Sequence, residues 1–341
     1  MKMLQIISGL SAGGAEHFVL ELCKQSRLVP GAHMDVLTMS AVDEISYKFK
    51  EAGIEIIAPS SHNRKPLKAF HALRVLFKQP HSVFHAHMFH ACIIACIARI
   101  FRPSVKVVFT LHNNHVPQWH RQLLLFLTRP LRHTDIIFPG LKRKWFQKKD
   151  AIEIPTGIDF SRYHASQQKP EVFTFLFAGR LEPEKNPLYL ISFSKSLQHK
   201  FRFHINVAGD GSLRNELEQR IKAGKLEQYI TLHGHVNDIT AFLSRGHCLL
   251  LPSLWEGMPM IVLEAAASSL PVIATPAGSI PQIISADEGY IGDTDQFPEL
   301  ADRVINNYSE ALTKAESLQQ TLKKVSSIDA VYAQHLKVYS H

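Results

Sequence analysis

Residues 253–267 read S-L-W-E-G-M-P-M-I-V-L-E-A-A-A and place two glutamates, Glu256 and Glu264, around a Gly-Met-Pro turn. The spacing between them turns an α-helix by about 800°, which leaves the two carboxylates about 80° apart. They therefore fit poorly on one helical face. Pro259 suits the first position of a helix, where its missing N–H group would be unpaired anyway. We predict that Glu256 lies in a loop and Glu264 about one turn inside the following helix.

The start of this predicted helix is suited to binding a phosphate group or a sugar hydroxyl group. A helix N-terminus presents several unpaired N–H groups and about half a positive charge. The two carboxylates can then accept hydrogen bonds from hydroxyl groups on either side. A capping box of Ser253 and Glu256, with Glu264 as a surface residue, is the alternative that the spacing alone leaves open.

Two loops upstream follow predicted buried strands and carry residue types that bind phosphate. The apolar run 172–177 leads into Gly179 and a loop with two cations, Arg180 and Lys185, which would both reach a diphosphate. A second run, 205–208, ends in a glycine turn at Gly209. The glutamate loop itself follows a third apolar run. The sequence thus predicts that cations and carboxylates gather at the ends of strands.

A glycine loop lies between the first predicted strand and the first predicted helix. Gly13 and Gly14 in this loop would let backbone amides approach a phosphate closely. Neither the spacing G-x-G-x-x-G nor a P-loop sequence is present. A tight turn without a ligand is the alternative.

Among the 20 histidines, His112, His85 and His87 are the candidate site residues. His112 ends the apolar run 107–111, at the carboxyl edge where α/β proteins bind ligands. His85 and His87 also stand at a strand end. A zinc site is not expected, because no carboxylates or thiols stand nearby at the spacing of metal ligands.

The alternation of strands and helices in a doubly wound sheet occurs twice. The predicted helix of the first half covers 16–25. Strands are predicted at 3–7, 33–39, 54–57, 83–85, 106–111 and 135–138 in the first half, and at 174–178, 202–208, 230–233, 248–252 and 272–275 in the second.

Five motifs in this order resemble the retaining family 4 glycosyltransferases of the GT-B architecture. They are G-G-A-E (13–16), T-L-H (110–112), I-P-T-G-I-D (154–159), G-R-L-E-P-E-K (179–185) and E-x7-E (256–264). The resemblance implies an α/β fold with two Rossmann-like, doubly wound domains that face a cleft. The expected domains are an acceptor-side domain over 1–160, a nucleotide-sugar-binding domain over 161–325 and a C-terminal helix, 326–341, that returns to the first domain.

The resemblance also implies a reaction. A sugar would move from a UDP- or GDP-linked donor to a hydroxyl group of a lipid-linked saccharide, with retention of configuration, in surface polysaccharide or lipopolysaccharide biosynthesis. The implied catalytic residues are His112, Arg180, Lys185 and Glu256, and the donor-binding residues are Gly13, Gly14, Gly179, Gly209, Gly257, Met258, Pro259, Met260 and Glu264. We predict that His85 and His87 line the acceptor side. A sugar-nucleotide epimerase and a catalytically idle GT-B protein are the alternatives.

Positive charge is concentrated in the first half of the chain. Residues 1–150 contain 21 Lys or Arg and 9 Asp or Glu, whereas residues 151–341 contain 17 and 21, so the charges are +12 and −4. Cations alternate with apolar residues in three clusters, at 64–78, 121–132 and 142–149. This composition is typical of segments that bind anionic lipid, and the alternative is an ordinary solvated helix face. Nucleic acid is not expected, because no binding motif accompanies the charge.

No cofactor or metal is expected. The D-x-D sequence at Asp293–Asp295 resembles a metal-binding motif, but its position before a predicted helix indicates that Asp295 is a turn or N-cap residue. No apolar run reaches the about 18 residues that span a bilayer, and the short run after Lys2 is interpreted as a strand rather than a signal peptide. The four cysteines show no pairing pattern. The expected location is the cytoplasm, at the inner face of the membrane.

Two positions depart from the family pattern. Thr156 stands where asparagine is usual in the hinge, and Ser269 stands where a helix-ending glycine is common. A residue other than glycine in a left-handed helix cap costs about 1 kcal/mol. We expect the fold to tolerate this cost.

Overall fold

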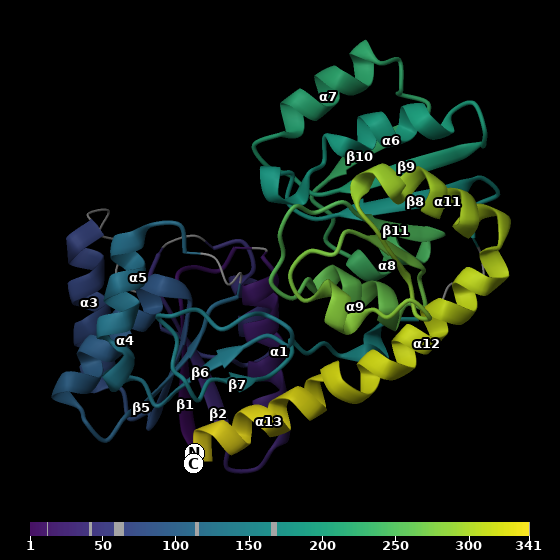
Figure 1. Ribbon diagram of the computed structural model, residues 1–341. Coiled ribbons are helices and arrows are strands. Elements are labelled where there is room, and N and C mark those ends of the chain that lie inside the picture. Colours follow the sequence, from purple (N-terminus) through teal and green to yellow (C-terminus); the bar gives the residue numbers. More distant parts are fainter. Residues whose placement is uncertain (12, 41–42, 58–64, 113–115, 165–168, 341) are drawn as a thin grey trace. The chain divides into compact units, whose positions relative to one another are not determined.

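The computed structural model describes residues 1–11, 13–40, 43–57, 65–112, 116–164 and 169–340, and the side chains of all of these except 65–71. The chain forms two compact units (Figure 1). Unit 1 contains Met1–Ile158 and Ile328–His341, and unit 2 contains Asp159–Ser327. Both are α/β units with a parallel sheet at the centre.

Unit 1 contains a seven-stranded sheet with the order β3-β2-β1-β4-β5-β6-β7. Its strands are β1 (Lys2–Ile7), β2 (His33–Thr38), β3 (Ile56–Ile57), β4 (Val83–His87), β5 (Lys106–Thr110), β6 (Thr134–Ile137) and β7 (Ile152–Glu153). Its α-helices are α1 (Gly14–Leu28), α2 (Ser46–Glu51), α3 (Lys65–Lys78), α4 (Met88–Phe101), α5 (Trp119–Leu127) and α13 (Ile328–Ser340). In Figure 1, α3, α4 and α5 lie together, and α1 lies with α13. Because β2 and β4 extend the sheet in opposite directions from β1, right-handed crossovers put α1 and α4 on opposite faces.

The C-terminal helix α13 is part of unit 1. Its first amide, of Ile328, donates to the carbonyl of Ile158 at 2.8 Å. A Cβ atom at Gly157 would lie 2.9 Å from Cβ of Val331, so only glycine lets this segment approach the helix. The preceding helix, α12, ends at Ser326 in unit 2, and Ser327 is extended.

Unit 2 contains a six-stranded sheet with the order β10-β9-β8-β11-β12-β13. Its strands are β8 (Phe173–Ala178), β9 (Phe203–Ala208), β10 (Ile230–Gly234), β11 (Cys248–Leu251), β12 (Val272–Ala274) and β13 (Tyr290–Ile291). Its α-helices are α6 (Tyr189–Leu197), α7 (Arg214–Ala223), α8 (Ile239–Ser244), α9 (Met260–Ala267), α10 (Ile280–Ile283), α11 (Phe297–Asn306) and α12 (Tyr308–Ser326).

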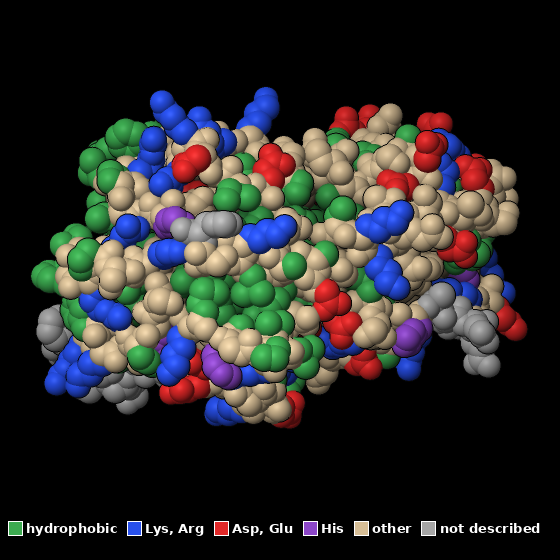
Figure 2. Space-filling view, turned by 90° about the horizontal axis from the view of Figure 1, so that it is seen from below, with side chains coloured by type: hydrophobic (Ala, Val, Ile, Leu, Met, Phe, Trp, Pro, Cys, Tyr) green, Lys and Arg blue, Asp and Glu red, His purple; other side chains and the backbone are tan. Residues whose placement is uncertain are grey.

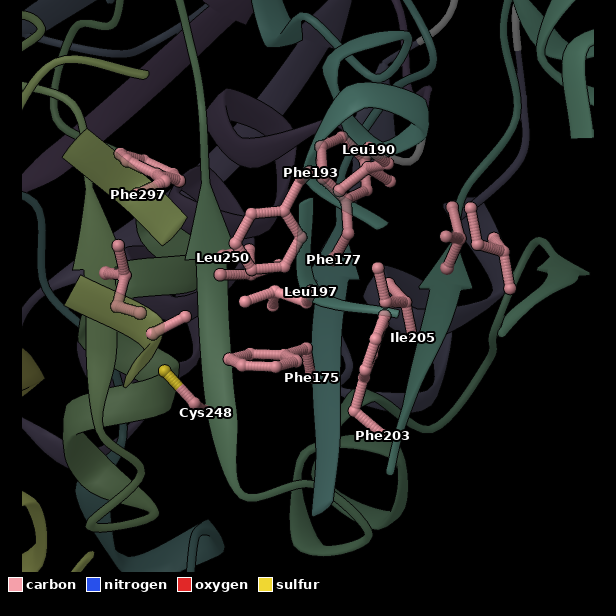
Figure 3. Packing of buried hydrophobic residues seen from close by; sticks show 14 of the residues in the cluster. Phe175, Phe177, Leu190, Phe193, Leu197, Phe203, Ile205, Cys248, Leu250 and Phe297 are labelled. Atoms are coloured by element: carbon pink, nitrogen blue, oxygen red, sulfur yellow. The ribbon is translucent and has the colours of Figure 1, made fainter. Parts of the chain in front are cut away.

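The core of unit 2 follows the alternation of side chains along its strands. Phe175 and Phe177 of β8 point to one face, where Figure 3 shows them among Phe193 of α6 and Phe297 of α11. Leu176 points to the other face, where a Cβ atom on Gly246 would lie 2.2 Å from its Cγ. Both faces of the sheet are therefore covered, as a parallel sheet requires.

The predicted strands are all present, with ends that differ by a residue or two. The two-residue edge strands β7 and β13 are not among the predicted strands. Ser269 adopts the left-handed conformation (φ 50°), as its place at the end of α9 predicts. Among the described helices, none has both the length and the hydrophobicity that crossing a bilayer demands.

Candidate functional site

In both units the strand order reverses between two neighbouring strands, and α/β proteins bind ligands beside the carboxyl ends of strands at such a reversal. In unit 2 the reversal lies between β8 and β11. The loop after β8 contains Arg180 and Lys185, and the loop after β11 contains Glu256. Because β8 and β11 are hydrogen-bonded neighbours, the topology brings these predicted residues to one edge of the sheet.

Lys185 and Glu256 form a nearly buried ion pair. The Nζ atom of Lys185 donates to both carboxylate oxygens of Glu256, at 2.5 and 2.7 Å. The two side chains are 18% and 6% exposed. Ser253 Oγ donates to the Oε1 atom of Glu256 at 2.7 Å, and no helix begins at Ser253, so the capping-box alternative is wrong. The carboxylate is held between a cation and a hydroxyl group.

The loop after β11 leads into α9, which begins at Met260. Pro259 is the N-cap residue, with an extended ψ of 116°, so the prediction that it is the first helical residue was wrong by one position. Glu264 lies about one turn inside α9, as predicted, and its Oε1 atom accepts a hydrogen bond from the Tyr163 hydroxyl at 3.1 Å.

Two residues that support this loop were not identified from the sequence. The amide and the hydroxyl of Ser279 donate to the carbonyl of Gly257 at 3.0 and 2.8 Å. Gly278 has a φ of 61°, and a Cβ atom there would lie 2.2 Å from the carbonyl oxygen of Glu256. Like Tyr163, these residues are outside every motif, so only the fold reveals their role.

The second cation of the loop after β8, Arg180, is much more exposed than Lys185. The Arg180 side chain is 68% exposed and pairs with Glu184 at 2.7 Å. A Cβ atom on Gly209 would lie 1.9 Å from the carbonyl oxygen of Gly179, so glycine at 209 lets two strand ends pack closely. This packing explains Gly209 without a ligand, and donor binding by both glycines stays a prediction.

In unit 1 the reversal lies between β1 and β4, and the glycine loop follows β1. Gly13 is the N-cap residue of α1, and Gly14 is its first helical residue. A Cβ atom on Gly13 would lie 2.5 Å from Oε2 of Glu16, whose Oε1 accepts from Ser11 Oγ at 2.8 Å. The Glu16 carboxylate therefore lies over the loop, and a diphosphate beside Gly13 and Gly14 would meet its negative charge.

The three predicted histidines lie together in unit 1. His85 and His87 are on β4 and are fully buried, whereas His112 follows β5 and is partly exposed. Nδ1 of His87 lies 2.8 Å from Nε2 of His112, and the ring centroids of His85 and His87 are 4.2 Å apart. Both β4 rings are enclosed by protein. Their burial therefore does not support the prediction that His85 and His87 contact an acceptor directly. His112 is the histidine of the three that a ligand can reach.

Burial keeps this cluster uncharged. Desolvation lowers the pKa of His112 to about 3 and lowers the pKa values of His85 and His87 well below the usual histidine value. His335 of α13 packs beside His85, with ring centroids 5.7 Å apart, and desolvation lowers its pKa to about 4. The rings are therefore neutral at physiological pH.

The D-x-D sequence forms a helix cap. The Asp293 side chain accepts from the backbone of the following turn, and Gln296 completes the capping box by accepting from the Asp293 amide. The cap is thus at Asp293, while Asp295 lies within the turn. Within the described part of the chain, no three His, Cys, Asp or Glu side chains are placed to hold a metal ion.

Two protein families match the sequence, one in each unit. The family described as Glycosyltransferase Family 4 matches residues 12–139, and the family described as Glycosyl transferases group 1 matches residues 172–310. The fold is similar to a crystal structure of Anabaena HepE in complex with UDP and glucose, with a TM-score of 0.85, 17% identity and coverage of 100% of this chain and 99% of that one.

Two of the curated relatives have names that specify an undecaprenol-linked saccharide. An Escherichia coli UDP-Gal:alpha-D-GlcNAc-diphosphoundecaprenol alpha-1,3-galactosyltransferase is 27% identical over 62% of this chain. The chain spans 62% of that relative's length, less than two thirds. A Campylobacter jejuni N-acetylgalactosaminyltransferase that acts on a PP-undecaprenol saccharide is 25% identical over 78% of this chain and 76% of its own length. From the two family matches and the GT-B fold, the chain belongs to the family 4, or group 1, glycosyltransferases.

Proposed function

We propose that this chain is a retaining glycosyltransferase that moves a sugar from a UDP- or GDP-linked donor to a hydroxyl group of a saccharide. The observation that carries the proposal is the Lys185–Glu256–Ser253 arrangement at the strand reversal of unit 2, directly before the N-terminus of α9. A cation, a carboxylate and free helix amides at one strand edge suit a diphosphate joined to a sugar. Membership of the family supports the same reaction.

In this reaction the bond between the anomeric carbon and the diphosphate oxygen breaks, a bond to the acceptor hydroxyl oxygen forms, and the hydroxyl proton passes to the departing diphosphate oxygen. Arg180 and Lys185 stabilise the negative charge that develops on the diphosphate. Glu256 and the Gly257–Met260 segment hold the sugar, and Glu264 accepts from ribose hydroxyl groups. Stabilisation of the leaving group acts mainly in the transition state, so it accelerates the chemical step. No metal is part of this proposal, because these cations and helix amides neutralise the phosphates.

Unit 1 supplies the acceptor side in this proposal. His112, the partly exposed histidine, contacts the donor sugar, and the fully buried His87, which lies 2.8 Å from it, acts through it rather than on the acceptor. Gly13 and Gly14 border the diphosphate once the Glu16 side chain moves aside. A role for Gly13 and Gly14 therefore depends on a movement that donor binding must drive.

The experiment is incubation of the purified protein with UDP- and GDP-linked sugars, with and without a lipid extract that contains polyprenyl-linked saccharides. A glycosyltransferase releases nucleoside diphosphate and extends the acceptor only when both substrates are present. An epimerase releases nucleotide without an acceptor, and an idle protein releases none. Glycan product of retained configuration supports the proposal, and either of the other results overturns it.

A lipid-linked acceptor at the inner face of the membrane is the finer proposal. The relatives' names support it, and so does the surface of α5, where Leu125 alone is buried. The alternative interpretation, an ordinary solvated helix whose apolar side chains point inward, therefore fits only Leu125. Large apolar side chains that are exposed on and near α5 are Trp119, Leu123, Leu124, Phe126, Leu127 and Trp145. Such exposed apolar groups between cations are typical of surfaces that bind anionic lipid.

Lys and Arg side chains lie among hydrophobic side chains on the face of unit 1 that Figure 2 shows at the left. In the 142–149 cluster the exposed cations are Lys142, Arg143, Lys144 and Lys149. Lys148 is different, because its Nζ atom donates to the carbonyls of Arg132 and His133 at 3.1 and 2.9 Å. It therefore stabilises the fold and is unsuited to a test of membrane binding. Of the 64–78 cluster, Arg64 and the side chains of Lys65 and Lys68 lie outside the described residues.

The membrane proposal is tested by sedimentation with liposomes. Neutralising the four exposed cations together should weaken binding to anionic liposomes, and several tenths molar salt should release the wild type, because the Debye length falls below about 10 Å. The matched control neutralises four exposed lysines of unit 2, Lys195, Lys200, Lys323 and Lys324, and should bind normally. Equal sedimentation with neutral and anionic liposomes, or with neither, would point to a soluble acceptor.

A further inference from the structure

A chain of hydrogen bonds runs from the interior of unit 1 to His112. The Oε1 atom of Gln5 lies 2.7 Å from Nε2 of His87, and Nδ1 of His87 lies 2.8 Å from Nε2 of His112. Gln5 and His87 are fully buried. They belong to β1 and β4, the neighbouring strands at which the sheet order reverses. Since His112 is partly exposed, the chain of bonds ends at a ring that a ligand can reach.

The amide group of Gln5 sets the direction of these bonds. Its Nε2 atom donates to Sδ of Met34 at 3.4 Å, which leaves Oε1, an acceptor only, facing His87. The reverse orientation would put Oε1 against the sulfur, so that two acceptors would meet without a proton. Burial raises the pKa of Tyr339, and a hydrogen bond with Gln5 opposes the rise, as expected of a donating amide nearby. Nε2 of His87 therefore carries the proton.

The direction passes from His87 to His112. A neutral imidazole has one N–H group, so the proton on Nε2 leaves Nδ1 of His87 as an acceptor. The Nε2 atom of His112 must then donate to it, which leaves a lone pair on Nδ1 of His112. Desolvation lowers the pKa of both rings, so neither needs a second proton. In the part of the chain that the structure describes, Nδ1 of His112 makes no hydrogen bond.

We propose that Gln5 and His87 are positioning residues that hold His112 in the tautomer whose Nδ1 atom accepts a hydrogen bond from a hydroxyl group of the substrate. This inference rests on the proposed function, in which His112 contacts the donor sugar. A neutral His112 in this tautomer does not donate to the diphosphate through Nδ1. A site built to accept from a hydroxyl group discriminates against the deoxy analogue.

A neighbouring branch of the same cluster provides a matched control. His85 packs on His87, but its ring nitrogens bond to the Tyr339 hydroxyl and to Thr110 Oγ1, at 2.7 and 2.9 Å. Thr110 is fully buried like Gln5 and is outside the chain that ends at His112. Thr110→Val therefore disturbs the buried cluster without changing the direction of the Gln5–His87–His112 bonds.

The test is nitrogen NMR of ¹⁵N-histidine-labelled protein, with the His112 signals assigned by their loss in His112→Asn. In the wild type, Nε2 of His112 should be protonated and Nδ1 unprotonated, and Thr110→Val should give the same result. In Gln5→Leu the two tautomers should mix. The kcat/KM for the nucleotide sugar should fall about tenfold in Gln5→Leu, the scale of one hydrogen bond, and stay near the wild-type value in Thr110→Val.

The outcomes separate this inference from the proposed function. A proton on Nδ1 of His112 in the wild type, or an unchanged tautomer in Gln5→Leu, overturns the positioning role. If Gln5→Leu does not fold, the wild-type spectrum alone decides the tautomer. If the wild type transfers no sugar, the proposed function fails, while the spectrum still decides the inference about Gln5 and His87.

Discussion

The ion pair between Lys185 and Glu256 predicts a large energetic coupling. Removing one partner of a buried pair costs about 3–5 kcal/mol, because the other charge is left without a partner. Lys185→Met leaves a carboxylate that is 6% exposed, with Ser253 as its hydrogen-bond donor, so we expect a loss of about 3 kcal/mol in the free energy of unfolding. Glu256→Gln should cost about 1–2 kcal/mol, since Lys185 is more exposed and reaches water.

The double variant Lys185→Met/Glu256→Gln leaves neither charge unpaired. Its loss should be smaller than the sum of the two single losses by about 1–3 kcal/mol, measured by urea denaturation. Arg180→Met is the matched control, because its pair with Glu184 is largely exposed and should contribute less than about 1 kcal/mol. Strictly additive losses for Lys185 and Glu256 would refute the reasoning.

The same pair predicts opposite effects on nucleotide binding. Lys185→Met should weaken binding of the nucleoside diphosphate by about tenfold, because a charge contact is lost. Glu256→Gln should leave binding unchanged or tighten it, because a negative charge beside the diphosphate is removed. Alanine at Arg180, Lys185 or Glu256 should each lower kcat by at least about a hundredfold. Isothermal titration with UDP and GDP measures the binding, and an equal loss of affinity in both single variants would contradict the proposed roles.

Three further outcomes are expected. Ser269→Gly should stabilise the protein by about 0.5–1 kcal/mol in urea denaturation, because Ser269 is left-handed, whereas Ser268→Gly, at a position with a negative φ (−88°), should destabilise it. The pKa of His335 is about 4 in the folded chain, so the unfolded chain binds more protons below pH 6.5, and this ring alone should contribute about 2 kcal/mol to the loss of stability as the pH drops to 5. His335→Gln should reduce the total loss by about that amount without abolishing it, because His85, His87 and His112, whose pKa values desolvation also lowers, add to the loss. EDTA should leave transferase activity intact, and a loss that manganese restores would instead implicate Asp293 and Asp295.

The sequence predicted where the chemistry lies along each sheet. The strand ends that precede Arg180, Glu256 and His112 could be read from apolar runs, because a parallel strand buried on both faces is almost wholly apolar. A turn or helix cap at Asp295 followed from its place before a predicted helix, although the structure puts the cap two residues earlier, at Asp293, and Asp295 within the turn. These predictions needed only local patterns and the rule that sites lie at carboxyl edges of strands.

The sequence did not predict which site residues are buried or which of them bond to each other. His85 and His87 stand at a strand end like His112, yet both are buried. Tyr339 of α13, from the far end of the chain, lies against His85, and Gln5 of β1 lies against His87. Likewise Lys185 and Glu256 were each assigned to the substrate, and the structure pairs them with each other. Such contacts join residues that are far apart in the sequence, and the local hydrophobic periodicity of the sequence does not predict them.

The tautomer of His112 also depends on residues that are far from it in the sequence. The T-L-H motif contains His112, but the proton on its ring is set by Gln5 and His87, and Gln5 lies outside all five motifs. A change at Gln5 would therefore leave every motif intact while altering the hydrogen-bonding group that the substrate meets. It follows that intact motifs do not by themselves separate an active glycosyltransferase from an idle one, and that the buried residues behind a motif belong in that judgement.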